Sequence, residues 1–168
     1  SVVYVPGNYG ADFAGSLGID RDSAVRISNY AGFMLDEARS LGFTKILLVG
    51  DLGKLVKIAG GCFQTHSAVS DARVEILTAN AALLGADRDV LAKIMECPTT
   101  AAAADIIREA GLDDLWQVLA DKIRLRCQRR AFGEIEVGVV LFERGYGLLA
   151  QTENAAGMID GAKAECEA

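Results

Sequence analysis

The sequence lacks any long hydrophobic run. Its most apolar stretches, such as residues 45–50, are interrupted by charge or glycine well before the roughly 20 residues that a membrane-spanning helix needs. The first residues, 1–6, show no basic segment followed by an apolar core, which disfavours a secretory signal. We therefore expect a cytoplasmic protein with no membrane partner. Because the chain starts with Ser1 and not with methionine, we also expect it to continue from a longer protein.

The sequence is also poor in positive charge, in histidine and in paired cysteines. Lys and Arg number 17 against 23 Asp and Glu, and the net charge of −6 disfavours a nucleic-acid partner. With one histidine and no CxxC pair, neither a zinc site nor a disulfide framework is predicted. We expect reduced thiols in the cytosol at Cys62, Cys97, Cys127 and Cys166.

What is present is an alternation of strand and helix patterns. Runs of β-branched and aliphatic residues predict strands at 2–5, 45–49, 136–142 and 148–151. Apolar stripes and capping residues predict helices at about 11–17, 27–41, 69–83, 89–96, 99–110 and 113–130. The stripe of the third helix is Val69, Ala72, Ile76, Ala79 and Leu83.

These patterns predict an α/β fold in one domain. We expect a layered, Rossmann-like arrangement in which helices flank a small, mostly parallel sheet of about four strands, with a C-terminal hairpin. A chain of 168 residues is long enough for one well-buried core. The domain is expected to span residues 1–152, and residues 153–168 are expected to form a loose polar tail.

Ligands of an open parallel sheet bind beyond the carboxyl ends of its strands, so two glycine-rich loops are the first candidate sites. The loop after the first strand holds Gly7, Asn8 and Gly10. Its backbone amides can receive a carboxylate or phosphate at a helix start. The GxxG spacing departs from the GxGxxG of dinucleotide-binding proteins, and a simple turn with positive φ explains the glycines equally well.

The loop after the next strand holds Gly50, Asp51, Gly53 and Lys54. It lacks the spacing and the Ser or Thr of a nucleotide-binding P-loop, which disfavours hydrolysis of nucleoside triphosphates. Asp51 follows a strand directly and can accept hydrogen bonds from ribose hydroxyls. Alternatively it caps the next turn or helix, and both interpretations stay open.

Further along the chain, His66 and Ser67 lie in a glycine-flanked segment that leads to Asp71. His66 can act as a base or as a hydrogen-bond donor to an anionic group, although a lone histidine near a helix start is more often a capping or packing residue. A basic stripe on the long helix faces either a polycarboxylate ligand or solvent; it consists of Lys122, Arg126, Arg129 and Arg130.

Several segments, in this order and spacing, resemble the cobalt-precorrin-5B C-1-methyltransferase family. They are 6–10, 27–36, 48–50, 53–57, 59–61, 65–67 and 71–73, and the similarity extends over about residues 2–150. The resemblance implies transfer of a methyl group from S-adenosylmethionine to C-1 of a cobalt-corrin intermediate of cobalamin biosynthesis. It also implies an additional N-terminal domain. Without that domain, the chain is expected to bind ligands but not to convert the substrate.

The resemblance also assigns roles to residues by position. It implies that Gly7, Asn8, Gly10, Gly50, Asp51 and Gly53 bind the methyl donor, that Lys54, His66 and Ser67 bind the substrate, and that His66 and Asp71 serve catalysis. Asp51 departs from the family, in which we expect a histidine at this position. The cobalt belongs to the substrate, so we expect no metal site in the protein.

Two other functions remain open from the residues alone. One is a non-catalytic, Rossmann-like module that binds a nucleotide or serves assembly, and a homo-oligomer is compatible with either interpretation. The other is a nicotinamide oxidoreductase, and the missing GxGxxG disfavours it.

Overall fold

The computed structural model describes residues 1–167, and their side chains as far as residue 164. In chain order, the elements are β1 (Val2–Val5), α1 (Asn8–Ser16), β2 (Val25–Arg26), α2 (Ala31–Ser40), β3 (Lys45–Asp51), α3 (Leu52–Ala59), α4 (Arg73–Leu83), α5 (Arg88–Met95), α6 (Thr100–Glu109), α7 (Asp114–Arg130), β4 (Glu136–Glu143), β5 (Gly147–Gln151) and α8 (Ala155–Glu167). Within these residues no helix is long and apolar enough to cross a membrane.

The strands form one sheet in the order β2-β1-β3-β4-β5. All neighbours are parallel except β4 and β5, which make the C-terminal antiparallel hairpin. This confirms the predicted α/β class and the mostly parallel sheet. The fifth strand, β2, was not predicted, because it has only two residues and both are exposed, so it carries no apolar pattern.

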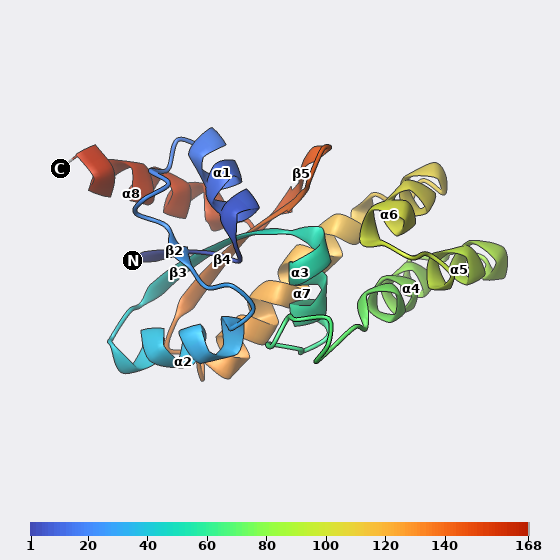
Figure 1. Cartoon of the computed structure of the whole chain (residues 1–168), viewed down its shortest axis with the longest axis horizontal. Coiled ribbons are helices and arrows are strands. Elements are labelled where there is room, and N and C mark those ends of the chain that lie inside the picture. The colour runs from blue at the N-terminus through green and yellow to red at the C-terminus, as the bar shows by residue number, and fades with distance from the viewer. Residues whose placement is uncertain (168) are drawn as a thin grey trace.

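Helices cover both faces of the sheet, which makes three layers (Figure 1). The alternation of side chains along β3 sends Ile46 and Leu48 to one face and Leu47 and Val49 to the other. α1 and α8 pack on the face of Leu47 and Val49, whereas α2, α3 and α7 cover the opposite face. Continuous apolar strands are the expected result of a sheet that is buried on both sides.

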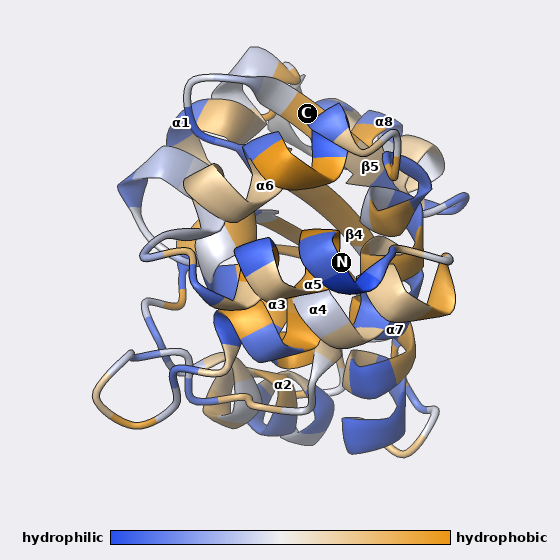
Figure 2. Ribbon diagram, turned by 90° about the vertical axis from the view of Figure 1, so that its right-hand side faces the viewer, coloured by the Kyte–Doolittle hydropathy of each residue, from blue (hydrophilic) through white to orange (hydrophobic). Residues whose placement is uncertain are grey.

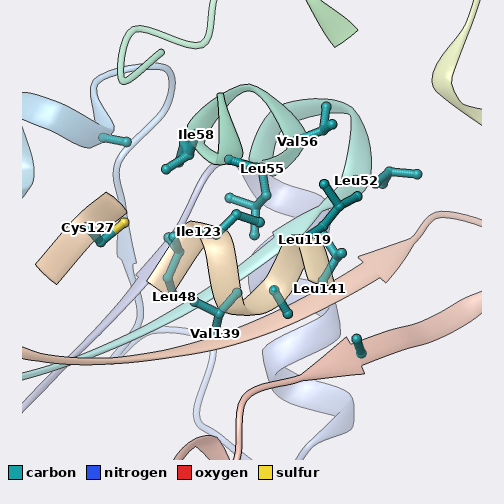
Figure 3. Close-up of a cluster of buried hydrophobic side chains, with 14 of the residues drawn as sticks. Leu48, Leu52, Leu55, Val56, Ile58, Leu119, Ile123, Cys127, Val139 and Leu141 are labelled. Carbon is teal, nitrogen blue, oxygen red and sulfur yellow. The ribbon is translucent and has the colours of Figure 1, made fainter. Parts of the chain in front are cut away.

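The larger core lies between the sheet, α3 and α7. Figure 3 shows the side chains that converge there, namely Leu48, Leu52, Leu55, Val56, Ile58, Leu119, Ile123, Cys127, Val139 and Leu141. The segment that forms α3 was not predicted to be a helix, and its glycines were interpreted as a loop. In the structure Asp51 caps α3, and residues 55–59 are all buried.

Helices α4, α5 and α6 form a group of their own that contacts the rest mainly through α3 and α7. In Figure 2 these helices lie in front of the apolar strand β4 and carry hydrophilic segments. The stripe predicted for residues 69–83 is wrong, because α4 begins only at Arg73 and buries Leu77 and Ala81. Val69 and Leu83 are exposed instead.

The C-terminal residues do not form the predicted loose tail, since residues 155–167 make helix α8. Ala155, Ile159 and Ala162 recur at helical spacing and are buried against the sheet. Gly138 makes room for this helix, because a Cβ at that position would lie 2.6 Å from the sulfur of Met158. The small residues that suggested a tail therefore allow close packing of a helix.

Candidate functional site

A cleft of about 430 Å³ opens at the carboxyl edge of the sheet. It is lined by residues from the ends of β1, β3 and β4 and from the start of α6: Pro6, Tyr9, Gly10, Asp51, Leu52, Lys54, Thr99, Thr100, Ala101, Glu143 and Arg144. The chain leaves β1 toward β2 on one side and returns to β3 on the other side, so this edge is a topological switch point. The two predicted loops therefore meet in one cleft, as expected.

The glycines of the first loop have distinct structural roles. Gly7 precedes α1 with φ 107° and ψ −177°, a conformation that is essentially restricted to glycine. A Cβ on Gly10 would lie 2.9 Å from the carbonyl oxygen of Val49, so its absence lets α1 approach β3 closely. Gly10 lines the cleft, while Gly7 and the exposed Asn8 stand beside it.

Asp51 connects two walls of the cleft through its carboxylate. Its Oδ1 accepts a hydrogen bond from the backbone N–H of Gly53 at 2.9 Å, which caps α3. Its Oδ2 accepts from the backbone N–H of Arg144 at 3.3 Å, which ties the end of β3 to the β4–β5 turn. The capping role that the sequence left open is therefore present, and contact with a ligand stays a prediction.

The other two glycine positions of this region differ in their surroundings. A Cβ on Gly53 would lie 3.2 Å from the hydroxyl of Thr100, so Gly53 is next to the cleft. A Cβ on Gly50 would lie 2.7 Å from Leu55, which places Gly50 in the packing of α3 against β3. Gly50 is therefore needed for the core, and a direct contact with a ligand is not required to explain it.

Three helices begin at the cleft, which makes it suitable for an anion. α1 and α3 follow the ends of β1 and β3, and α6 begins with Thr99, whose hydroxyl caps the helix by accepting from the N–H of Ala102 at 3.1 Å. The first amides of a helix have no intrahelical partner and carry a partial positive charge. Asp51 and Thr99 already cap the amides of Gly53 and Ala102, so a carboxylate or phosphate in the cleft would meet chiefly the start of α1, which no side chain caps, and the remaining amides of α6.

Lys54 contributes the cleft's cation on the α3 side. Its Nζ lies 3.5 Å from the carbonyl oxygen of Ser28 and 4.0 Å from the position that a Cβ would take on Gly7. Partial burial lowers the pKa of Lys54, and the neighbouring Asp51 carboxylate opposes that shift. The ammonium group is thus held between the loops that follow β1 and β2.

The end of β4 supplies two residues that sequence analysis missed. Glu143 is 7% exposed and accepts hydrogen bonds from Arg108 of α6. The guanidinium of Arg144 stacks on the ring of Tyr9, 4.3 Å from its centroid, at the edge of the cleft. Because β4 runs parallel to β3, its carboxyl end lies at the same edge of the sheet, and the strand-end rule that directed attention to the first two loops applies to these residues as well.

His66 and Ser67 lie elsewhere, on the exposed segment between α3 and α4. The Nδ1 of His66 accepts a hydrogen bond from the backbone N–H of Ala68 at 3.1 Å. The neutral imidazole therefore carries its proton on Nε2 and can donate it to a ligand. Neither residue lines the cleft.

Asp71 lines a second cleft of about 180 Å³ that shares Thr99 and Thr100 with the first. Its carboxylate accepts from Arg73 at 2.6 and 3.3 Å. The hydrogen bond and the positive charge of Arg73 lower the pKa of Asp71. Asp71 is thus a carboxylate engaged with an arginine beside the main cleft.

Lys57 is a buried lysine that sequence analysis did not single out. Its Nζ donates to the carbonyl oxygen of Thr65 at 2.8 Å, and the backbone N–H of Thr65 donates to the carbonyl of Asn29. Burial lowers the pKa of Lys57, and the nearby Arg73 lowers it further. The segment that carries His66 is therefore held at its base, next to the loop after β2.

Two residues of the basic stripe on α7, Lys122 and Arg130, have structural contacts, whereas Arg126 and Arg129 are exposed. Arg130 donates hydrogen bonds to the carboxylate of Asp36 at 2.6 and 3.0 Å and lies 4.9 Å above the ring of Phe63, while Lys122 donates to the side chain of Asn80.

Cys62, Cys97 and Cys127 are free thiols, and Cys166 lies outside the described side chains. Among the described side chains, no three His, Cys, Asp or Glu residues gather closely enough to hold a metal ion.

Comparison with known proteins identifies relatives over nearly the whole chain. A family model described as "CbiD, C-terminal domain" matches residues 64–153. A protein from Alkaliphilus metalliredigens named cobalt-precorrin-5B C(1)-methyltransferase is 43% identical over 164 residues, which cover 97% of this chain and 44% of that protein. Proteins of the same name from Listeria welshimeri and Clostridioides difficile are 45% and 37% identical, over 91% and 95% of this chain and 42% and 40% of their own lengths.

The chain thus spans less than half the length of the curated relatives it matches. The family model covers the part of the chain from the His66 segment to β5, whereas the relatives also match the loops after β1 and β3. No solved structure matches the chain significantly.

Proposed function

Because the chain belongs to the CbiD family, we propose that it is the part of a cobalt-precorrin-5B C(1)-methyltransferase that holds the methyl donor. The observation that carries this proposal is the cleft at the carboxyl edge of β1, β3 and β4. It lies at the switch point of a parallel sheet, where α/β enzymes place their ligands. We infer the reaction from the names of the relatives, and we infer from the cleft where one reactant binds.

The residues of the cleft fit S-adenosylmethionine. The first amides of α1 and α6 and the ammonium of Lys54 suit the carboxylate of the amino-acid part. At Gly10 the helix backbone is not shielded by a side chain, and the volume of about 430 Å³ lies in the range of small-molecule sites. A corrin ring with its acetate and propionate groups is much larger, so we assign the cleft to the methyl donor.

The chemistry makes modest demands on the protein. When bound, S-adenosylmethionine supplies a methyl group activated by a sulfonium centre. The residues of the chain then have to orient the donor, keep water out and leave one side open to the acceptor carbon. Strong acid-base groups are not required, which agrees with a cleft built from backbone amides, threonines and ion-paired side chains.

We propose that the corrin substrate lies outside this cleft, against the remainder of the longer protein. His66 and Ser67 are exposed, and His66 can donate a hydrogen bond from Nε2 to a carboxylate of the corrin. We keep Asp71 as a further candidate at the second cleft, where its carboxylate is held by Arg73. The proposed location is the cytoplasm, with the N-terminal part of the longer protein as the partner.

Titration calorimetry on the complete protein tests this function. We expect S-adenosylhomocysteine and a cobalt-corrin intermediate to bind separately, and methyl transfer to C-1 when S-adenosylmethionine and the corrin are combined. Binding of a nucleoside without any methyl transfer would favour a non-catalytic module. If neither ligand binds the complete protein, the methyltransferase proposal is wrong.

A further inference from the structure

Glu143 is an acidic residue in an unusual position, since it lines the cleft although only 7% of its surface is exposed. It is the last residue of β4. Arg108 of α6 donates to its carboxylate from Nη1 at 2.6 Å and from Nη2 at 3.5 Å. A buried carboxylate is stable only when it is paired in this way.

The charges of the hydrogen-bonded group formed by Glu143, Arg108 and Asp105 do not cancel. Arg108 also donates to the carboxylate of Asp105 at 2.7 Å and stacks on the ring of Tyr146, 4.3 Å from its centroid. Two carboxylates therefore share one guanidinium, which leaves one negative charge in this group. The carboxylate oxygens of Glu143 offer more lone pairs than Arg108 uses.

The cleft consequently has walls of opposite charge. Lys54, the start of α1 and Arg144, whose guanidinium stacks on Tyr9 of α1, form a positive wall. Glu143 with Arg108 and Asp105 forms a negative wall on the α6 side. The carboxylate of Asp51 caps α3 and lies beside the ammonium of Lys54, so its negative charge is offset on that side of the cleft. Such a cleft suits a ligand that carries both an anionic group and a cationic centre.

We propose that Glu143 recognises the positive sulfonium centre of the methyl donor and so distinguishes the donor from its uncharged thioether product. This inference rests on the proposed function and adds to it the residue that decides between the two ligands. Loss of the methyl group leaves a neutral sulfur, and its attraction to the carboxylate disappears. The same residue thus favours binding of the donor and release of the product.

The test is the affinity of the complete protein and of its Glu143→Gln variant for S-adenosylmethionine and S-adenosylhomocysteine, measured by calorimetry. Loss of one partly desolvated charge pair should weaken S-adenosylmethionine about tenfold. The affinity for S-adenosylhomocysteine should change by less than about twofold, because that ligand has no sulfonium charge. A purely structural role would weaken both ligands alike, and that outcome would overturn the proposal.

Glu136→Gln is the matched control, because Glu136 lies at the opposite end of β4, 3.4 Å from Lys45 and far along the strand from the cleft. It should leave both affinities unchanged. If Glu143→Gln does not fold, the unaltered protein still provides a test, since sinefungin carries an amine where the donor has its sulfonium. Sinefungin should then bind more tightly than S-adenosylhomocysteine, and the reverse order contradicts the proposal. If none of these nucleosides binds, the proposed function fails and not this inference alone.

Discussion

The cleft at the sheet edge and the segment around His66 differ in how firmly the fold holds them. The cleft is built from the ends of three strands and the start of α6, and Asp51, Gly10 and Glu143 each join two elements there. The His66 segment is exposed and is attached mainly at its base, through Thr65. A firmly held cleft would bind one ligand tightly, and the exposed His66 segment beside it could adjust to a larger ligand.

The largest effect should come from adding a side chain at Gly10, where α1 approaches β3 closely. In Gly10→Val the Cβ alone would lie 2.9 Å from the carbonyl oxygen of Val49, and the two methyl groups need further space. We expect a loss of about 2–3 kcal/mol in the free energy of unfolding, with loss of nucleoside binding. Urea unfolding of the variant measures this loss. Gly157→Ala, on α8 with open space around it, is the control and should stabilise by roughly 0.5–1 kcal/mol. Equal stability of Gly10→Val and the wild type would contradict the close packing of α1.

The next effect compares two aspartates, one in each region. Asp51→Ala removes the cap of α3 and the bond to the Arg144 amide, so we expect a loss of about 1–2 kcal/mol. Asp71→Ala removes an exposed contact with Arg73 and should change stability much less. Thermal unfolding of both variants tests the difference. Similar losses would mean that the two regions are equally well held.

His66→Ala should separate activity from stability. We expect methyl transfer by the complete protein to fall roughly tenfold, because one hydrogen bond to the substrate is lost. The melting temperature should stay unchanged, since the side chain is exposed and bonds only the Ala68 amide. His66→Gln keeps a donor and should recover part of the rate. Full activity of His66→Ala would assign this histidine to the local turn alone.

The smallest effect concerns the pH dependence contributed by Lys57. Its pKa is lowered by burial from the ordinary value of 10.5, so the unfolded chain binds more protons between the lowered pKa and 10.5. The stability of the wild type relative to Lys57→Met should therefore rise as the pH rises through that window. Urea unfolding at about pH 8 and about pH 10 measures the change. Lys93→Met, at an exposed position, is the control. If the difference in unfolding free energy between the wild type and Lys57→Met is the same at both pH values, the burial of Lys57 is contradicted.

Much of the sheet could be predicted from sequence, but some of the helices could not. β1, β3, β4 and β5 lie within two residues of their predicted limits, because each is a continuous apolar run between turn residues. α3 was missed because Gly53 and the glycines after it suggested a loop, although Leu55, Val56 and Ile58 pack in the core. α8 was missed because two of its three buried positions, Ala155 and Ala162, are alanines, which give a weak hydrophobic signal, although both pack on the sheet with Ile159.

The candidate site was predicted in part for similar reasons. Gly10, Asp51 and Lys54 were expected near a ligand and do line the cleft, since strand ends are readily located in a sequence. Glu143 and Thr99 were not expected there. The position of Thr99 depends on how α6 returns to the sheet, which neighbouring residues in the sequence do not indicate, whereas Glu143 directly follows the strand predicted at 136–142 and was overlooked.

Local sequence patterns were enough to establish the α/β class, the four longer strands, and the edge of the sheet where a cleft would form, because these follow from hydrophobic period and turn residues. Which side chains meet in that cleft depended on the folded chain as a whole. Folding made the carboxylate of Asp51 a helix cap and joined Glu143 to Arg108 of α6. It also left His66 outside the cleft. Contacts between distant residues depend on packing among all the layers at once, and no short segment of sequence carries that information.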